Sequence, residues 1–134
     1  LGFRVAALRD GALDLRGQRV DRGGVVDQAG RVVVERCWVA DSFGARLVGL
    51  LGTAQLDADE GLWLTPCSAI HMFGMRFPIA VAFLDEGGGV MRLLDPVLPG
   101  TRLRQPGSRS VIEAPLGAFS ACRVGDILRV VRPD

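Results

Sequence analysis

Short runs of apolar and β-branched residues, separated by Gly, Pro and charged positions, make up most of the chain after residue 30. Runs of this length with turn residues between them predict strands rather than helices. The run 79–84 is continuously apolar, so we expect a strand that is covered on both faces. The expected strands lie at residues 31–40, 61–64, 69–73, 79–84, 90–94, 110–114 and 127–131.

The segments between these runs carry typical turn and helix signals. Asp85 begins an acidic, glycine-rich hairpin connection, Pro96 begins a loop that runs through Pro99 and Gly100, and the segment 123–126 predicts a turn. Asp41-Ser42 is a helix N-cap signal, and apolar residues follow it at helical spacing as far as a glycine stop. Residues 115–122 are long enough for one or two further helical turns.

The pattern as a whole predicts a mainly β domain. About six to eight short strands with frequent Gly and Pro indicate a compact β-sandwich or barrel-like fold with one or two short helices. A chain of 134 residues is the size of one domain. We expect this domain at residues 31–134, and a loosely ordered N-terminal extension at residues 1–30, which are rich in Gly, Asp and Arg.

Charge and composition narrow the class of protein. The chain has 16 basic and 15 acidic residues, and they are interspersed without a basic stripe along it, which argues against nucleic-acid binding. No apolar run approaches the roughly 20 residues of a membrane-spanning helix, so we expect no membrane insertion.

The cysteines and the N-terminus bear on the compartment. Three scattered cysteines without a C-x-x-C pair favour free thiols in a reducing compartment. Arg4 and Arg9 interrupt the N-terminal stretch where a signal peptide has an apolar region. We therefore expect a cytoplasmic protein, and we expect it to be a monomer.

Candidate chemistry concentrates in residues 66–85, PCSAIHMFGMRFPIAVAFLD. This stretch holds the only histidine of the chain, His71, together with Cys67, Met72 and Met75. It also holds a Gly-Met-Arg-Phe-Pro corner between two apolar runs. If the protein has a site, we expect it here.

Three motifs occur in an order that resembles the DUF192 family: ARLVGLLG at 45–52, EGLWLTPCSAIHMFGMRFPIAVAFLD at 60–85, and RVGD at 123–126. The resemblance covers approximately residues 32–131. DUF192 proteins are small bacterial and archaeal proteins of unknown function, and the resemblance implies a compact, β-rich sandwich. Members of the family typically carry Asp where this chain has Ala80, so a mechanism that requires that carboxylate beside His71 or Arg76 is in doubt for this chain.

Cys67 and His71 suggest one possible chemistry, because a thiolate and an imidazolium form a nucleophilic pair in hydrolases and transferases. Alternation along a strand puts the two side chains on one face. Four residues of strand nevertheless span about 13 Å, so a bend is needed to bring them together. We favour a buried structural Cys67 and a core His71 over this hypothesis.

Metal binding is a second hypothesis. Thiolate, imidazole and thioether groups suit copper(I), and Cys67, His71, Met72 and Met75 supply them within a short span. The two methionines fit equally well as core-filling residues. Zinc is disfavoured because the other cysteines lack paired spacing. We expect no metal or other cofactor.

The favoured hypothesis is a noncatalytic module that binds a small ligand or a peptide. Arg46, Arg76 and His71 together would form an anion pocket, and Gly74 would let a ligand approach the backbone closely. An interaction protein that contacts its partner through residues 1–30 is a further alternative. The expected site residues are His71, Gly74, Met75 and Arg76, with Arg46 and Cys67 close by.

Overall fold

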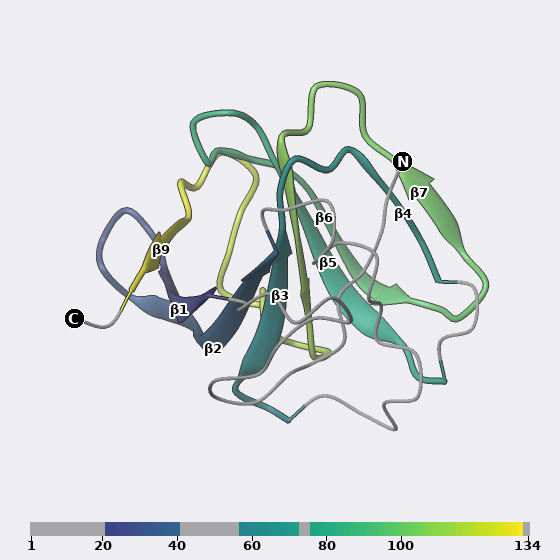
Figure 1. Ribbon diagram of the computed structural model, residues 1–134, viewed down its shortest axis with the longest axis horizontal. Helices are drawn as coiled ribbons and strands as arrows, with labels where there is room; N and C mark the ends of the chain where they lie inside the picture. Colours follow the sequence, from purple (N-terminus) through teal and green to yellow (C-terminus); the bar gives the residue numbers. More distant parts are fainter. Residues whose placement is uncertain (1–20, 41–56, 73–75, 133–134) are drawn as a thin grey trace.

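The computed structural model describes residues 21–40, 57–72 and 76–132, and within these ranges the protein is built of strands without a helix (Figure 1). Seven strands form the main sheet and two form a separate ribbon. The order in the main sheet is β6 (Val90–Val97), β5 (Ile79–Leu84), β8 (Ser110–Ala114), β3 (Glu60–Leu64), β2 (Val32–Ala40), β1 (Asp21–Val26) and β9 (Arg129–Val131). The ribbon pairs β4 (Ala69–His71) with β7 (Arg102–Arg104).

Alternation along β5 divides the core into two clusters. All six residues of β5 are buried. Because successive side chains of a strand point to opposite faces, Val81 and Phe83 lie in one cluster and Ala80 and Ala82 in the other. The outer cluster, defined by its buried members, contains Trp38, Leu62, Leu64, Cys67, Ile70, Met72, Ile79, Val81, Phe83, Val97 and Val111. The inner cluster contains Val25, Val34, Cys37, Ala80, Ala82, Leu84, Val90, Ile112, Ala114, Phe119 and Leu128.

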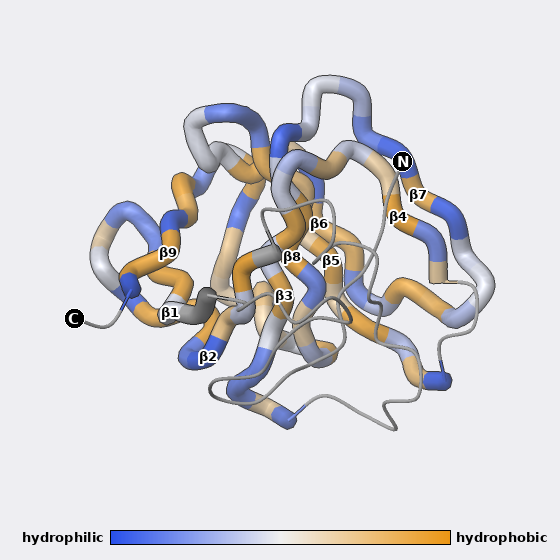
Figure 2. Tube along the Cα trace, in the orientation of Figure 1, coloured by the Kyte–Doolittle hydropathy of each residue, from blue (hydrophilic) through white to orange (hydrophobic). Residues whose placement is uncertain are grey.

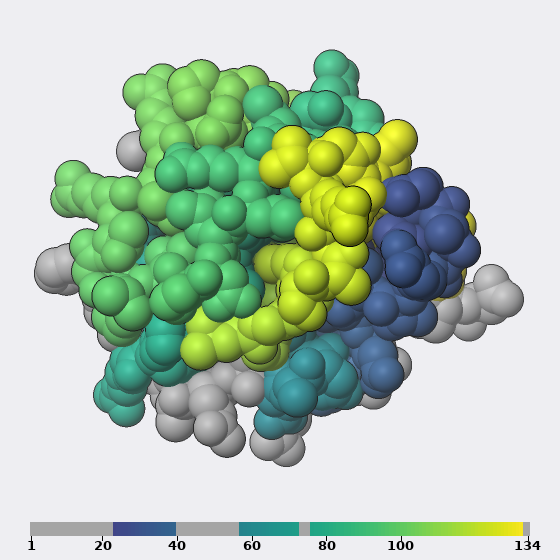
Figure 3. Space-filling view, turned by 180° about the vertical axis from the view of Figure 1, so that it is seen from behind, coloured from purple at the N-terminus to yellow at the C-terminus, as the bar shows by residue number. Residues whose placement is uncertain are grey.

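The main sheet is open, but residues next to its two edge strands, β6 and β9, contact each other at one corner. An isolated bridge joins Gly89, just before β6, to Ile127, just before β9. The N–H of Leu128 donates to the carbonyl of Gly88 at 2.9 Å. Gly88 has φ of +86°, and a Cβ there would lie 2.5 Å from the Leu128 carbonyl oxygen, so this close approach requires glycine. From behind, the yellow C-terminal segment lies between the blue and green parts of the sheet (Figure 3).

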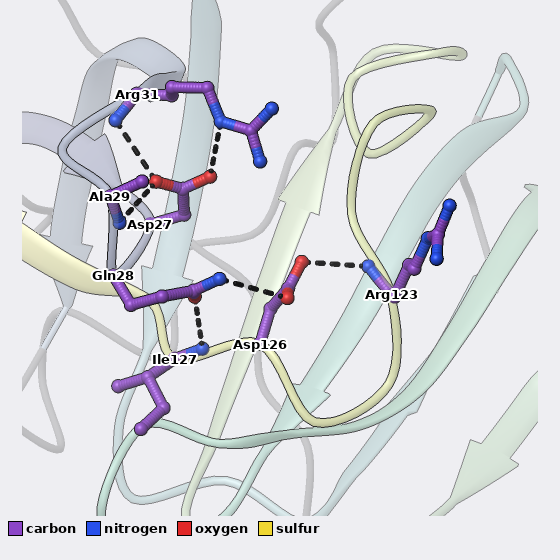
Figure 4. A network of polar contacts seen from close by, with 7 residues as sticks. All are labelled: Asp27, Gln28, Ala29, Arg31, Arg123, Asp126 and Ile127. Carbon is purple, nitrogen blue, oxygen red and sulfur yellow. Dashed lines mark hydrogen bonds and ion pairs between the residues drawn. The ribbon is translucent and has the colours of Figure 1, made fainter.

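A polar network lies beside this contact and links the β1–β2 turn to the segment before β9 (Figure 4). The side-chain amide of Gln28 donates to Asp126 Oδ1 at 3.1 Å, and its oxygen accepts the N–H of Ile127 at 2.9 Å. Asp126 Oδ2 accepts the N–H of Arg123 at 2.9 Å, which closes the expected 123–126 turn. The RVGD motif therefore has a structural role: it ties the turn before β9 to the turn after β1.

Asp27 organises the neighbouring β1–β2 turn. Its side chain accepts the N–H groups of Ala29 and Arg31 and the Nε–H of Arg31, at 2.9 to 3.0 Å. Burial pushes the pKa of Asp27 upward, but these hydrogen bonds and the Arg31 charge hold it below its ordinary value. The carboxylate is thus favoured in the folded state.

The β4–β7 ribbon packs over the outer cluster. Ile70 and Met72 are buried in that cluster, and Leu103 of β7 packs against it. Ser108 links the segment before β4 to the start of β8, because its Oγ lies 2.9 Å from the carbonyl oxygen of Ser110 and 3.1 Å from that of Cys67. The ribbon and the main sheet therefore form the two layers of a small sandwich, with the outer cluster between them.

The mainly β fold expected from the sequence is confirmed, and all main-sheet strands except β1, together with β4 of the ribbon, overlap predicted strands. Two strands were not expected: β1, which lies within the range assigned to the extension, and β7. Pro96, predicted to begin a loop, lies inside β6, which is tolerated because β6 is the edge strand of the sheet. The domain boundary at residue 31 stays a prediction.

Residues 115–122 form consecutive turns rather than a helix. The N–H of Ala118 donates to the carbonyl of Pro115, and that of Cys122 to the carbonyl of Phe119, each across three residues. Gly117, with φ of +83°, interrupts any helical continuation. The helix expected after Asp41-Ser42 lies outside the described residues. Where the structure describes the chain, it contains no helix with the length and apolar character that a membrane crossing requires.

Candidate functional site

His71 lies on the exposed face of the β4–β7 ribbon. Its neighbour Ile70 is buried against the sheet, and the alternation of the strand turns His71 outward, where it is exposed. In the ribbon register His71 stands directly opposite Arg102, and Ala69 stands opposite Arg104. Pairing of the strands therefore brings the only histidine of the chain beside an arginine that is distant in sequence.

The part of the chain that forms the ribbon is cationic. Residues 61–84 and 96–112 contain no Asp or Glu. The ion pairs found among the described residues involve Arg31 and Arg36, and none involves an arginine of the ribbon. Among the described residues, Arg102 and Arg104 therefore form no ion pair with a carboxylate. The exposed arginines of these two segments are Arg76, Arg102, Arg104 and Arg109.

Cys67 lies beneath this surface. It is 5% exposed and belongs to the outer cluster, and its thiol donates to the carbonyl of Ala69 at 3.1 Å. An activated thiolate must be accessible to its substrate, whereas this thiol is buried. Ile70 and Met72, rather than His71, join Cys67 in the outer cluster. Alternation from β4 does not extend to Cys67 because the strand begins only at Ala69.

Met72 is fully buried and fills the outer cluster, as the core-filling alternative for methionine expects. His71, by contrast, is exposed on the other face of the ribbon. Among the residues that the structure describes, no group of three or more His, Cys, Asp or Glu side chains is arranged to hold a metal ion. The copper hypothesis also involves Met75, which lies outside the described residues.

Position 80 faces away from the ribbon. Ala80 is 0% exposed in the inner cluster and stands opposite Ala114 of β8. The ribbon covers the outer cluster, on the other face of the same sheet. A carboxylate at position 80 would therefore enter the interior of the curled sheet, and the sheet would separate it from His71.

The structure describes three of the expected site residues, and their grouping into one site stays a prediction. His71 lies at the surface of the ribbon with Cys67 below it, and Arg76 is exposed just before β5. The remaining expected site residues, Arg46, Gly74 and Met75, lie outside the described residues.

Sequence reasoning missed the two arginines of β7. The Pro and Gly residues from Pro96 onward predict a loop, although Arg102-Leu103-Arg104 alternates polar, apolar and polar residues as an edge strand does. It also gave no weight to Glu113, which is fully buried on the outer face of the sheet. The register places Glu113 between Leu62 and Val81. A carboxylate at such a place is costly to bury, and composition alone does not reveal it.

Comparison with known proteins agrees with this architecture. The model of the DUF192 family, described as "Uncharacterized ACR", matches residues 24–130. No protein with a curated description matches the sequence. A crystal structure of a protein of unknown function from Novosphingobium aromaticivorans is similar with a TM-score of 0.70 and 20% identity, over 92% of this chain and 94% of that one.

A suggested transcription regulator from Sinorhizobium meliloti is similar with a TM-score of 0.69 and 17% identity, over 83% of this chain and 93% of that one. At these identities the two structures share the fold with this chain, and fold alone does not imply function.

Proposed function

The chain belongs to the DUF192 family, whose function is not established, and we propose from its own residues that it is a noncatalytic module that binds an anionic ligand. The proposed binding site is the stretch around His71 and Arg76. It also includes Gly74 and Met75, with Arg46 and Cys67 close by. The ligand is a small molecule or a peptide with carboxylate or phosphate groups. The protein acts on its partner by binding it, as an accessory module does.

One observation carries this proposal: His71 stands opposite Arg102 on an exposed ribbon whose surrounding chain contains no carboxylate. Arginine donates forked hydrogen bonds to carboxylates and phosphates, and an adjacent imidazole adds a further N–H donor. Arginines such as Arg102 and Arg104, which form no ion pair with a described residue, attract anions. This chemistry supports anion binding more directly than it supports bond cleavage.

The alternatives rest on weaker support. A hydrolase or transferase that uses Cys67 requires a reactive thiolate, whereas this thiol is buried and donates to a carbonyl. Rapid alkylation of Cys67 at mildly acidic pH would favour that alternative. Copper(I) binding requires Met72 to leave the outer cluster, where it is fully buried. A mass excess in native mass spectrometry that a chelator removes would favour copper.

The proposal is tested by nuclear magnetic resonance of the imidazole, which is unambiguous because the chain has 1 histidine. Addition of inorganic phosphate or glutarate should shift the His71 signals saturably. His71→Ala and Arg76→Ala variants should remain folded and lose binding as measured by calorimetry. Arg129→Ala on β9, an exposed arginine of the main sheet, is the matched control and should bind as the wild type does. If neither anion binds the wild type, or if both site variants unfold, the proposal fails.

A further inference from the structure

The outer edge of β7 has backbone groups directed away from the ribbon. The N–H of Met72 donates to the carbonyl of Thr101 at 2.7 Å, and the N–H of Gln105 donates to the carbonyl of Ser68 at 2.8 Å. In an antiparallel pair every second residue directs both backbone groups to the partner strand. Thr101, Leu103 and Gln105 therefore face β4, and the two residues between them face the other way.

Those two residues are Arg102 and Arg104. No further strand pairs with the ribbon among the described residues, and β7 lies at the margin of the molecule (Figure 1). Arg102 and Arg104 are exposed and share one face, while Leu103 packs against the outer cluster. Hydrophilic colour follows much of β7 in Figure 2. This edge thus combines outward N–H and C=O groups with two cationic side chains in register.

We infer that the outer edge of β7 is a docking site for an acidic, extended segment of a partner protein, which adds to the ribbon as a third strand. Strand addition gives affinity through main-chain hydrogen bonds and selectivity through alternate side chains. Because side chains alternate, carboxylates at every second position of the segment would face Arg102 and Arg104, and an apolar residue between them would lie beside Leu103. This inference rests on the proposed function, since it identifies the anionic ligand as a peptide.

Two other interpretations of this edge are less consistent with the structure. Charged side chains protect many edge strands from pairing, but they do so without favouring any one partner. A single-stranded nucleic acid would use the arginines, but it would leave the edge N–H and C=O groups unused. It would also lack a stacking platform, because no Phe or Trp among the described residues is exposed. The acidic peptide satisfies both the charges and the backbone groups.

The test uses short acetylated peptides of Glu and Val with a fluorescent label, and it measures binding to the full chain by anisotropy. The alternating peptide should bind, and a peptide of the same composition with its Glu residues in one block should bind at least about tenfold more weakly. Methylation of the backbone nitrogens on one edge of the alternating peptide should weaken binding by a similar factor, because it removes the donors that pair with β7.

Two variants of β7 separate the contribution of the side-chain charge to peptide binding from that of the backbone N–H. Arg104→Gln removes the charge and keeps the outward N–H, whereas Arg104→Pro removes both without removing a bond to β4. We expect about a tenfold loss for Arg104→Gln and a further loss of similar size for Arg104→Pro. Arg129→Gln, on the edge strand β9, is the control and should leave binding unchanged. Circular dichroism establishes that each variant is folded.

The outcomes distinguish the inference from the proposed function. If glutarate or phosphate shifts the His71 signals but peptide order, methylation and Arg104→Pro have no effect, anion binding stands and strand addition is wrong. If neither small anions nor peptides bind, both fail. If single-stranded DNA displaces the peptide and binds the Arg104→Gln and Arg104→Pro variants equally, the edge binds nucleic acid through charge alone, and the inference is overturned.

Discussion

Replacement of Ala80 by Asp tests the two-sided architecture directly, because it restores the residue that the family resemblance implies. Ala80 is 0% exposed in the inner cluster, opposite Ala114. Burial disfavours an ionised carboxyl group and raises its pKa by up to about 3–5 units. A rise of about 3 units corresponds to about 4 kcal/mol of lost stability when the group ionises near pH 7.

The destabilisation caused by Ala80→Asp should increase as the pH rises. An Asp with a raised pKa in the folded state binds its proton more tightly there than in the unfolded chain. Its cost is therefore absent below the unfolded pKa of about 3.9 and grows as the pH rises toward the folded pKa. Ala80→Asn is the matched control, since it adds nearly the same volume and no charge. Urea unfolding should show the two variants about equal near pH 4, about 1–2 kcal/mol apart near pH 5, and about 4 kcal/mol apart near pH 7.

The same variant measures the separation of position 80 from His71. A direct ion pair with Asp would raise the pKa of an imidazole by about 1–3 units. With the sheet between them, we expect the His71 titration measured by nuclear magnetic resonance to move by less than about half a unit relative to Ala80→Asn. An Ala80→Asp protein as stable as the wild type near pH 7, or one with a strongly raised His71 pKa, would refute the placement of position 80 in an apolar interior.

Three further predictions concern stability. Ile70→Ala removes a side chain that is 2% exposed between ribbon and sheet, and should cost about 2–5 kcal/mol in urea unfolding; a loss below about 1 kcal/mol would contradict this packing. The pKa of Asp27 is lowered in the folded state, so its stabilisation is complete above the unfolded pKa and is lost as the pH falls through the folded one. In the Asp27→Asn variant, the free energy of unfolding should therefore fall less steeply as the pH drops below about 4. If it falls as steeply as in the wild type, the lowered pKa of Asp27 is contradicted. Gly88→Ala should lower the melting temperature far more than Gly100→Ala. Both glycines have φ of +86°, but only at Gly88 would the added Cβ lie 2.5 Å from a carbonyl oxygen, that of Leu128. Equal losses of melting temperature would show that backbone strain alone matters.

Much of the β structure was predictable because its signals are local. The apolar run of β5 is bounded by Pro78 and an acidic, glycine-rich turn, and a strand buried on both faces has no polar alternation to obscure it. The RVGD turn before β9 follows from Gly and Asp, whose backbone preferences act within a few residues. Family resemblance extended this local information to the whole domain.

Other elements could not be predicted because long-range pairing creates them. β1 contains Gly23-Gly24, which disfavour a strand in isolation, and it forms because β2 and β9 pair on its two sides. β7 consists of only 3 residues and depends on the register with β4. Local propensity has too little weight in such short segments to compete with tertiary pairing.

The candidate site divides in the same way. By itself the sequence determined that His71, Cys67 and Met72 lie close together along the chain, since adjacency needs no folding. Only the tertiary structure decided that Cys67 and Met72 are buried while His71 faces outward, because the strand must first be seated on a core before one face becomes the inside. It likewise decided that Arg102 stands opposite His71, and that Ala80 points into the other side of the sheet. Contacts between segments about 30 residues apart are set by register and burial, which a linear pattern of residue types does not contain.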